Sequence, residues 1–377
     1  MVTFNLYFVI AIKSINPNEG DTVRRIMALA GSIAGITALA ASTLVVAVPA
    51  NAAETVSGGG ASFPYAWIQA CASDFNASQS NFTIQYTSTG SGTGKSNFAK
   101  RVFDYGQTDS KYSSGEPSFG WEYIPDIGGA VTFPINLKNK KTGRTLGSAI
   151  QLKQKTLAKI LGGVITKWND KEILKSNARI AKSIPATPIT VAYRSDNSGT
   201  SNNTLQHLNS WAPSIFGKVQ DDFSTAFPGG KPPASSIAAK GNAGVMASII
   251  AKEGAIGYVD LGDAKGYPAA RVENALGEFV APSSASAAKN LANQTNIGSN
   301  GLVSLNYNVK KKGAYPVAIF SYFLARTDGK GPNGLGVRQF ADYLIQKCGP
   351  QRAASLGYVP VAGKVLEKAK KLVRLIK

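Results

Sequence analysis

The sequence predicts an α/β protein, because short apolar strands alternate with helical segments along most of the chain. Two further observations fit this class. The 377 residues can bury one large core or two moderate ones, and the 44% hydrophobic content is that of an ordinary globular protein. We find no internal repeat. The composition therefore argues against a chain that is disordered throughout.

Five segments have the composition of strands. The run 82–87 (FTIQYT) alternates apolar and polar residues, as a half-buried strand does. The other four runs are short and apolar, which is typical of buried strands. They are 130–137 (AVTFPINL), 189–193 (ITVAY), 255–259 (AIGYV) and 317–324 (VAIFSYFL).

The segments between these strands favour helices and loops. Helices are expected at 156–161, 170–176, 244–252 and 337–347, and loops rich in Gly, Ser and Pro at 110–120 and 227–236.

The last fourteen residues predict an amphipathic helix. Its apolar face would carry Val365, Leu366, Ala369, Leu372, Val373 and Ile376. Lysines lie on the opposite face, so the helix either packs on the core with a solvated basic side or binds a membrane surface or wall polymer.

The N-terminal segment 1–52 has the pattern of an export signal. Val23-Arg24-Arg25 precedes an apolar, Ala-rich run over 26–48, and the small residues 49–53 form an A-x-A cleavage pattern. An uncleaved membrane anchor is the alternative. No cysteine lies in this segment, so a lipid anchor on a lipobox cysteine is not available. We expect a protein that works outside the cytoplasmic membrane, in the periplasm or at the cell surface or wall.

The chain is strongly basic. Its formal net charge is +19, of which residues 1–52 contribute +1, and such a surface favours anionic partners. The lysines are spread along the chain and form no recognisable nucleic-acid motif, so no nucleic acid is expected as a partner. The two cysteines, Cys71 and Cys348, fit either a disulfide of an exported protein or two buried thiols.

The glycine-rich stretch Ser88–Ser96 (STGSGTGKS) is similar to a phosphate loop but matches neither nucleotide motif. A P-loop needs a glycine five residues before the Gly-Lys-Ser, and that position is Thr89. The dinucleotide fingerprint fails because Lys95 occupies the place of its third glycine. The stretch is therefore not predicted to bind a nucleotide.

The sequence lacks the parts of the common hydrolases. His207 is the single histidine, and neither an H-E-x-x-H motif nor a cluster of carboxylates accompanies it. No G-x-S-x-G nucleophile elbow is present. We expect His207 to be a satisfied residue on a helix face, and we expect neither an enzyme nor a metal or organic cofactor.

Three turns carry donors that suit an oxyanion. Each follows a strand or a glycine run and precedes a helical pattern, so its amides are free to face a ligand. The turns are Gly58–Pro64 (GGGASFP), Ser88–Ser96, which precedes a helix expected over 96–101, and Tyr193–Ser201 (YRSDNSGTS). Such turns are common helix caps when taken singly. Three of them could converge on one anion.

The order of these motifs resembles the phosphate-binding protein of the bacterial high-affinity phosphate ABC transporter. The matching segments span nearly the whole chain after residue 52. They are GGGASFP (58–64), YTSTGSGTG (86–94), FDYGQTD (103–109), IGGAVTFPIN (127–136), LGGVITKWND (161–170), YRSDNSGTS (193–201), KGNAGV (240–245), GAIGYV (254–259) and LGYVPV (356–361). Ser62 stands where the family commonly has threonine, and Gln107-Thr108 replaces its usual small pair.

The resemblance implies an α/β, periplasmic-binding-protein-like fold with two lobes and a hinged cleft that closes on phosphate. Lobe I would comprise 55–133 and 317–377, and lobe II 134–316, with crossings near 131–135 and 315–319. Cys71 and Cys348 would then share a lobe, which favours a disulfide. The partners would be inorganic phosphate and a membrane ABC permease, and a monomer is expected.

The resemblance also implies a ligand set. Phosphate would be held by Ser62, Phe63, Ser91, Asp109, Arg194, Ser198, Gly199 and Thr200, with Asp196 orienting Arg194. Lys95 is expected to add to the surrounding positive field and not to grip a nucleotide. Arg194 offers a permanently charged fork of donors. Asp109 would repel any anion that lacks a proton, so it would select phosphate over sulfate.

Two rival functions belong to other classes. A secreted phosphatase could use a similar anion pocket, and metal-dependent turnover of a phosphomonoester would identify it. A cell-surface attachment protein could use the basic surface, and its binding would be abolished by salt.

Overall fold

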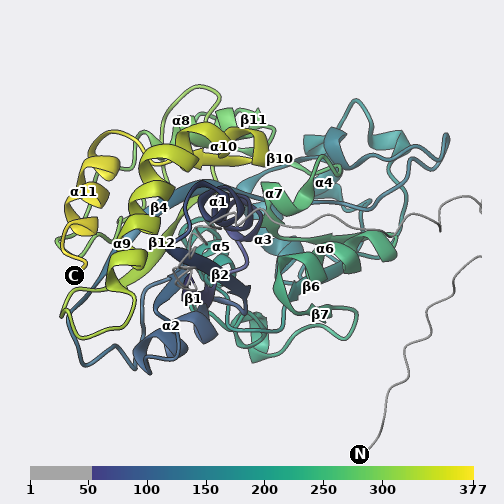
Figure 1. Cartoon of the computed structure of the whole chain (residues 1–377). Coiled ribbons are helices and arrows are strands. Elements are labelled where there is room, and N and C mark those ends of the chain that lie inside the picture. Colours follow the sequence, from purple (N-terminus) through teal and green to yellow (C-terminus); the bar gives the residue numbers. More distant parts are fainter. Residues whose placement is uncertain (1–52) are drawn as a thin grey trace, which may run out of the picture. The chain divides into compact units, whose positions relative to one another are not determined.

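The computed structural model describes residues 53–377, so the export signal expected over 1–52 lies outside the described residues. The described part is a mixed α/β structure built on one large sheet and two small ones (Figure 1). Within residues 53–377, none of the helices combines the length and the apolar character that a membrane crossing requires.

The large sheet contains seven strands, six of them in the order β13-β4-β12-β3-β1-β2, while β9 pairs with the end of β4. Strand β1 is parallel to both β2 and β3, whereas β12 is antiparallel to β3 and β4. The carboxyl ends of β1, β2 and β3 therefore meet at one edge. The strands are β1 Glu54–Gly60, β2 Phe82–Ser88, β3 Tyr105–Thr108, β4 Trp121–Thr132, β9 Val259–Asp260, β12 Ala318–Arg326 and β13 Tyr358–Pro360.

The two small sheets come from the middle of the chain. One has the order β7-β6-β8 and is parallel throughout. The other has the order β11-β10-β5. Helix α6 lies beside β6 and β7 in Figure 1 and packs against both. The strands are β5 Gln151–Leu152, β6 Thr190–Arg194, β7 Ile237–Ala239, β8 Ala255–Gly257, β10 Arg271–Glu273 and β11 Phe279–Val280.

Eleven α-helices connect and cover these sheets within the described residues. They are α1 Tyr65–Ser78, α2 Ser91–Ala99, α3 Gln154–Leu161, α4 Lys171–Ser176, α5 Gly199–Trp211, α6 Gly241–Ala251, α7 Leu261–Ala264, α8 Ser284–Leu291, α9 Gly334–Tyr343, α10 Gly349–Arg352 and α11 Gly363–Val373. A π-helical turn over Leu344–Cys348 follows α9.

Most of the expected elements are present, and four differ. The strand expected at 255–259 is divided at Tyr258 into β8 and β9, which belong to different sheets. The strand expected at 130–137 is the end of β4, which begins at Trp121 and stops at Thr132. The helix expected over 96–101 begins earlier, because α2 starts at Ser91 directly after the turn. The glycine run 58–60 is not a turn but the end of β1.

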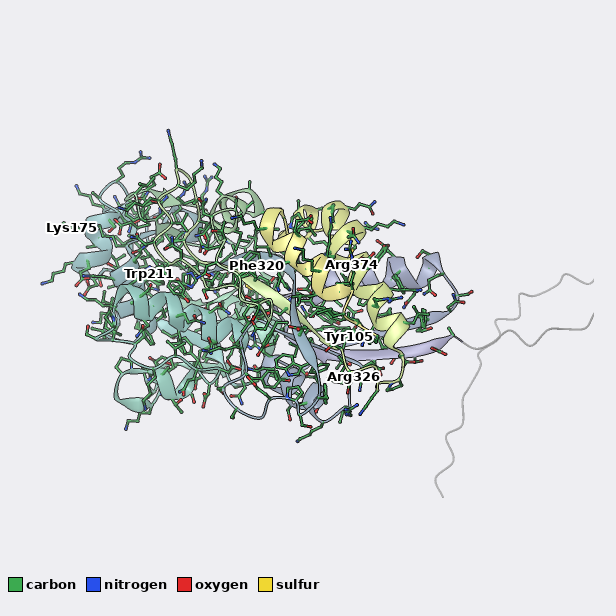
Figure 2. All side chains as sticks on the ribbon, turned by 90° about the vertical axis from the view of Figure 1, so that its left-hand side faces the viewer. Tyr105, Lys175, Trp211, Phe320, Arg326 and Arg374 are labelled. Carbon is green, nitrogen blue, oxygen red and sulfur yellow. A yellow bond between two sulfur atoms is a disulfide. The ribbon has the colours of Figure 1, made fainter. Side chains whose placement is uncertain are left out.

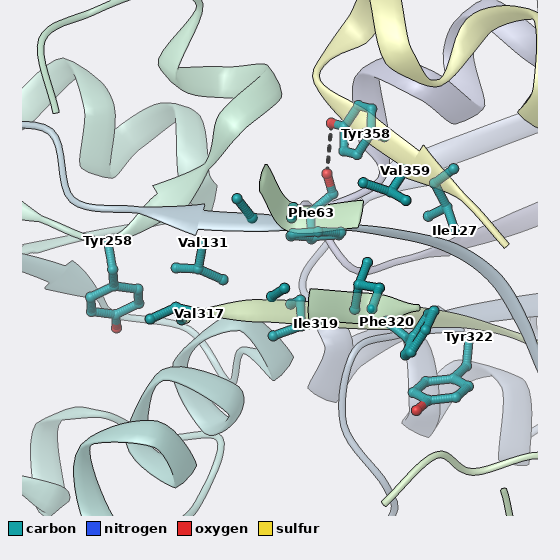
Figure 3. Close-up of a cluster of buried hydrophobic side chains, with 14 of the residues drawn as sticks. Phe63, Ile127, Val131, Tyr258, Val317, Ile319, Phe320, Tyr322, Tyr358 and Val359 are labelled. Carbon is teal, nitrogen blue, oxygen red and sulfur yellow. Dashed lines mark hydrogen bonds between the residues drawn. The ribbon is translucent and has the colours of Figure 1, made fainter. Parts of the chain in front are cut away.

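The core is continuous through the large sheet. Strand β12 is buried along its whole length, and Tyr105 of β3 stacks on Phe323 with ring centroids 4.6 Å apart. Figure 2 labels Tyr105 and Phe320 among these packed side chains. Figure 3 shows Phe63 in the same core, where the Tyr358 hydroxyl donates to the Phe63 carbonyl over 2.8 Å. The first ligand turn is thus anchored to the core.

The chain end is tied to the large sheet in two ways. A disulfide joins Cys71 of α1 to Cys348, with their Cα atoms 5.8 Å apart. Helix α11 packs against β4 and buries Val365, Ala369 and Leu372. The structure therefore favours the packed alternative for the basic C-terminal helix.

Candidate functional site

The first ligand turn follows β1. Ser62 and Phe63 precede α1, and both are buried. The Ser62 hydroxyl accepts a hydrogen bond from the backbone N–H of Asn242 over 3.3 Å, which links this turn to the start of α6. The hydroxyl hydrogen of Ser62 and the Phe63 amide are not used by this contact. Both are therefore donors suited to an anion.

The second turn follows β2. Gly90 adopts φ 90°, a left-handed conformation that favours glycine, and α2 begins at the next residue, Ser91. The Ser91 hydroxyl accepts from the Asp109 amide over 3.3 Å. Because Ser91 is the first helical residue, its own amide has no acceptor one turn earlier in the helix. Ser91 therefore joins the second turn to the end of β3.

Asp109 lies directly beyond β3, where the carboxyl ends of the parallel strands meet. Its Oδ1 accepts from the Ser321 hydroxyl over 2.7 Å, and its Oδ2 accepts from the Thr200 hydroxyl over 3.1 Å. A carboxylate can accept about four hydrogen bonds, so these two leave capacity for about two more donors. Ser321 lies on β12 and Thr200 on α5, and both residues are buried, so they fix the directions of the two carboxylate oxygens.

The third turn follows β6. Arg194, the last residue of this strand, is 1% exposed. Its Nε donates to Asp196 Oδ1 over 2.8 Å, and its Nη2 donates to Asp196 Oδ2. Its Nη1 donates to Asn242 Oδ1 over 2.8 Å. These bonds use three of the five guanidinium hydrogens and hold the fork rigidly.

Helix α5 completes the third turn. The Ser198 hydroxyl caps it by accepting from the Ser201 amide over 3.1 Å. The amides of Gly199 and Thr200 belong to the first turn of the helix and have no intrahelical acceptor. A helix N-terminus of this kind attracts negative charge.

The second and third turns and Asp109 are in contact. A side chain at Gly199 would begin 2.7 Å from the Ser91 hydroxyl and 2.7 Å from Cβ of Asp109. The amide of Gly92 also donates to the Asn197 carbonyl over 3.0 Å. Only a glycine permits this close approach. The structure thus brings Ser91, Asp109, Gly199 and Thr200 together.

Sequence reasoning missed Asn242, which connects the remaining parts. Its side chain accepts from Arg194 and donates to Asp260 Oδ2 over 2.7 Å, while its backbone N–H donates to the Ser62 hydroxyl. Asn242 lies in the segment KGNAGV that carried the family resemblance. Its place in this segment was the signal that the sequence offered.

The charges of the site are set by burial and by Arg194. Burial raises the pKa of Asp109 to about 6, against the lowering effect of the hydrogen bonds from Ser321 and Thr200 and of the Arg194 charge. Burial acts in the same direction on Asp196, but the hydrogen bonds and charge of Arg194 outweigh it, so its pKa lies below the usual range. At neutral pH both carboxyls are ionised.

The structure corrects the role expected for Lys95. Its Nζ donates to Asp221 Oδ2 over 2.8 Å, to Ser110 Oγ over 3.0 Å and to the Lys111 carbonyl over 2.8 Å. The exposed fractions of the Lys95 and Asp221 side chains are 8% and 16%. Lys95 is therefore a partner in a buried ion pair that joins α2 to the segment after α5.

A polar groove of about 900 Å³ borders this ion pair and reaches Asp109. Lys111, Asn202 and Gln206 are among its lining residues. Asp109 is thus one of the residues that line a groove beside the second and third turns.

His207 is buried on α5 and does not reach the site. Its Nδ1 lies 2.8 Å from the Asn203 carbonyl, and burial lowers its pKa to about 4. This is the satisfied helix-face residue that the sequence predicted. Among residues 53–377, no three His, Cys, Asp or Glu side chains gather into a group that could hold a metal ion.

The fold and the anion donors define a class of solute-binding protein. Residues 45–347 match the model of the PBP superfamily domain. Two solved structures share the fold, each 22% identical in sequence. One is a high-affinity periplasmic phosphate-binding protein, PfluDING, bound with phosphate (TM-score 0.67; 84% of this chain and 93% of that chain). The other is a phosphate-binding protein from Stenotrophomonas maltophilia (TM-score 0.63; 85% and 93%). The expected α/β, two-lobed periplasmic-binding-protein-like fold is confirmed.

Within this class, the chain belongs to the PstS family of phosphate-binding proteins. It is 32% identical over 314 residues to the phosphate-binding protein PstS of Xylella fastidiosa, covering 81% of each chain. It is 29% identical over 320 residues to the PstS of Pasteurella multocida, covering 84% of this chain and 89% of that protein. The family expected from the sequence motifs is confirmed.

Proposed function

We propose that this chain is an extracytoplasmic solute-binding protein that captures inorganic phosphate and delivers it to an ABC permease. The family membership supports this role. The observation that carries it is the arrangement of Asp109, whose two oxygens are held by Ser321 and Thr200 beside the α2 and α5 N-termini. An acceptor fixed among donors suits an anion that brings its own proton.

Each donor has a part in this proposal. The hydroxyls of Ser62, Ser91, Ser198 and Thr200 and the amides of Phe63 and Gly199 would replace water around the phosphate oxygens, while Arg194, oriented by Asp196, would balance charge. Asp109 would accept the hydrogen of the phosphate hydroxyl. Sulfate has no hydrogen at neutral pH and would leave two acceptors facing each other.

The sheet organisation supports the lobes that we propose. Apart from Glu54 at the start of β1, the strands β1 to β4, β12 and β13 fall in 55–133 and 317–377, and both small sheets fall in 134–316. Strand β9, the seventh strand of the large sheet, pairs with the end of β4 from within 134–316. Strand β4 ends near the expected crossing at 131–135, and β12 begins near the one at 315–319. The lobes would close on phosphate by a hinge there, and the permease would recognise the closed form.

The test is a calorimetric titration of the purified protein with phosphate, arsenate and sulfate at pH 8. We expect one phosphate per monomer, competition by arsenate and no heat from sulfate. A phosphomonoester is added in parallel, with and without divalent metal. Release of its alcohol would show a phosphatase instead of a transport component, and phosphate binding that disappears at moderate salt would favour a surface attachment role.

A further inference from the structure

A second carboxyl, Asp126, lies in the interior behind Asp109. It belongs to β4, in the middle of the large sheet, and is 1% exposed. Burying a lone carboxylate is costly unless a cation or several donors surround it. The side-chain hydrogen bond that Asp126 makes is one it accepts from Gln107, a neutral amide.

Gln107 connects Asp126 to the ligand-facing carboxyl. Its Nε2 donates to Asp126 Oδ2 over 2.7 Å and to Ser321 Oγ over 3.1 Å. The Ser321 hydroxyl in turn donates to Asp109 Oδ1 over 2.7 Å, a much shorter contact than the 3.4 Å to its other acceptor, the Thr108 carbonyl. Four side chains therefore form one buried chain of hydrogen bonds that ends at Asp109.

Two oxygens of this chain lack a donor. Asp126 Oδ1 and Gln107 Oε1 are both buried, and among the described residues neither has a hydrogen-bond partner. Asp126 and Gln107 are the two side chains that a hydrogen bond from Gln107 Nε2 to Asp126 Oδ2 already joins. A hydrogen on Asp126 Oδ1 would satisfy both at once, because a carboxylic acid and an amide form a cyclic pair of hydrogen bonds.

We propose that Asp126 is an uncharged carboxylic acid paired with the Gln107 amide, and that this pair positions the phosphate-selecting carboxylate Asp109. The inference deepens the proposed function and rests on it for the role of Asp109. Asp126 is a positioning residue, since it acts through Gln107 and Ser321. The pair fixes which end of the Gln107 amide faces Ser321, and so keeps Asp109 an acceptor.

The surroundings of Asp126 favour the neutral form. Burial raises its pKa to about 8, against the lowering effects of the Gln107 hydrogen bond and of the backbone amides of Asp126 and Ile127, while the negative charge of Asp109 also raises it. The other titratable groups that interact with it are Tyr86, Tyr105 and Tyr322, whose pKa values burial also raises. These phenols are neutral at pH 8, so they supply no compensating charge.

Ionisation of Asp126 would disturb the site. Asp126 Oδ1 and Gln107 Oε1 would then both be acceptors, and a second negative charge would lie behind Asp109. A turn of the Gln107 amide would take its donor away from Ser321. We therefore expect phosphate binding to weaken as the pH rises through about 8.

Gln107 is required for this arrangement because its side chain joins two other strands. Its Nε2 donates to Asp126 on β4 and to Ser321 on β12. A small side chain at this position could not reach both of them.

The first test observes the proton directly and needs no ligand. Infrared difference spectra of the full chain between pH 5 and pH 10 would follow protonated carboxylic acids. Burial also raises the pKa of Asp260, so the spectra of Asp126→Asn are subtracted from those of the wild type to remove its signal. We expect the difference to contain one acid that titrates near pH 8 and that persists in Asp109→Asn. Absence of any protonated acid from this difference above pH 7 would overturn the proposal.

The second test measures the effect on phosphate. The ratio of the phosphate Kd at pH 9 to that at pH 7 is compared between the wild type and Asp126→Asn, whose amide keeps a donor toward Gln107. We expect the wild-type ratio to exceed that of the variant by up to about tenfold per pH unit above the transition. Gln107→Leu should also lose the extra pH dependence. Equal ratios in all three proteins would refute the coupling, whereas absence of phosphate binding in the wild type would refute the proposed function and leave the infrared result intact.

Discussion

Asp109→Asn is the substitution that most sharply tests how the site selects its ligand. The side chain keeps its shape, but one oxygen becomes an N–H donor. The hydroxyls of Ser321 and Thr200 can rotate to accept from it or donate to it, so the local packing is retained. A sulfate oxygen would then meet a donor instead of a carboxylate.

The magnitude follows from the contact that changes. A hydrogen bond to a charged group contributes about 1.5 to 3 kcal/mol. At 1.36 kcal/mol per tenfold, sulfate affinity should rise by about 10- to 150-fold. Phosphate loses the ionised acceptor of its hydroxyl and keeps a neutral one, which corresponds to about a 2- to 10-fold loss. The preference for phosphate should fall by about two orders of magnitude.

The assay is competitive calorimetry with phosphate and sulfate at pH 8, where Asp109, with a pKa of about 6, is ionised. The wild type supplies an internal control. Below pH 6 its own Asp109 becomes protonated and can donate, so sulfate should begin to bind as the pH falls, while Asp109→Asn should show no such transition. A variant that still rejects sulfate at pH 8, or a wild type whose sulfate affinity does not change with pH, would refute this account of selectivity.

Four further predictions concern other parts of the molecule. Arg194→Ala should weaken phosphate binding at least about 100-fold in calorimetry. Arg194→Lys should weaken it less, because lysine keeps the charge but not the forked pair of guanidinium donors. Arg271 is exposed, so Arg271→Ala should have no effect. Lys95→Met leaves the partly buried Asp221 without its cation. Because this ion pair joins the two proposed lobes, phosphate affinity should fall by about 10- to 100-fold in calorimetry, and exposed Lys100→Met is the matched control. The double variant Cys71→Ala/Cys348→Ala opens a link over 277 residues and should lose up to about 5 kcal/mol of unfolding free energy in denaturant titrations, with unchanged phosphate stoichiometry. Folded Asp126 keeps its proton to about pH 8, whereas unfolded Asp126 loses it near pH 3.8, so its contribution lowers the stability of the protein as the pH rises between these values. In calorimetric melting, Asp126→Asn should therefore reduce the fall of Tm with pH over this range. An unchanged slope of Tm against pH would contradict the prediction.

Local patterns in the sequence predicted much of the fold and of the three turns. Strand β2, the helices that follow the turns and the apolar face of α11 all follow from periodicity and capping residues. Strand β1 did not, because three consecutive glycines disfavour a strand. The structure explains them: a side chain at Gly58 would begin 2.1 Å from the Tyr105 ring. A close contact between distant residues is invisible in a local pattern.

The parts of the site that sequence reasoning missed are long-range pairings. Lys95 and Asp221 are 126 residues apart, and Asn242 and Ser62 are 180 apart. Gln107 showed only as a departure from a family pattern, and its partners Asp126 and Ser321 lie on two other strands. Residue types alone marked these side chains as polar, and only the folded sheet shows which of them meet.

The central claim is that donors from three turns surround one small tetrahedral ion opposite Asp109. A crystal structure with arsenate tests it most directly, because anomalous scattering locates arsenic without prior assumptions. We predict a single arsenate within hydrogen-bonding distance of Arg194, Ser91 and Thr200, with one oxygen directed at Asp109. An arsenate bound elsewhere, or one that contacts Arg194 while Asp109 faces away, would contradict the account.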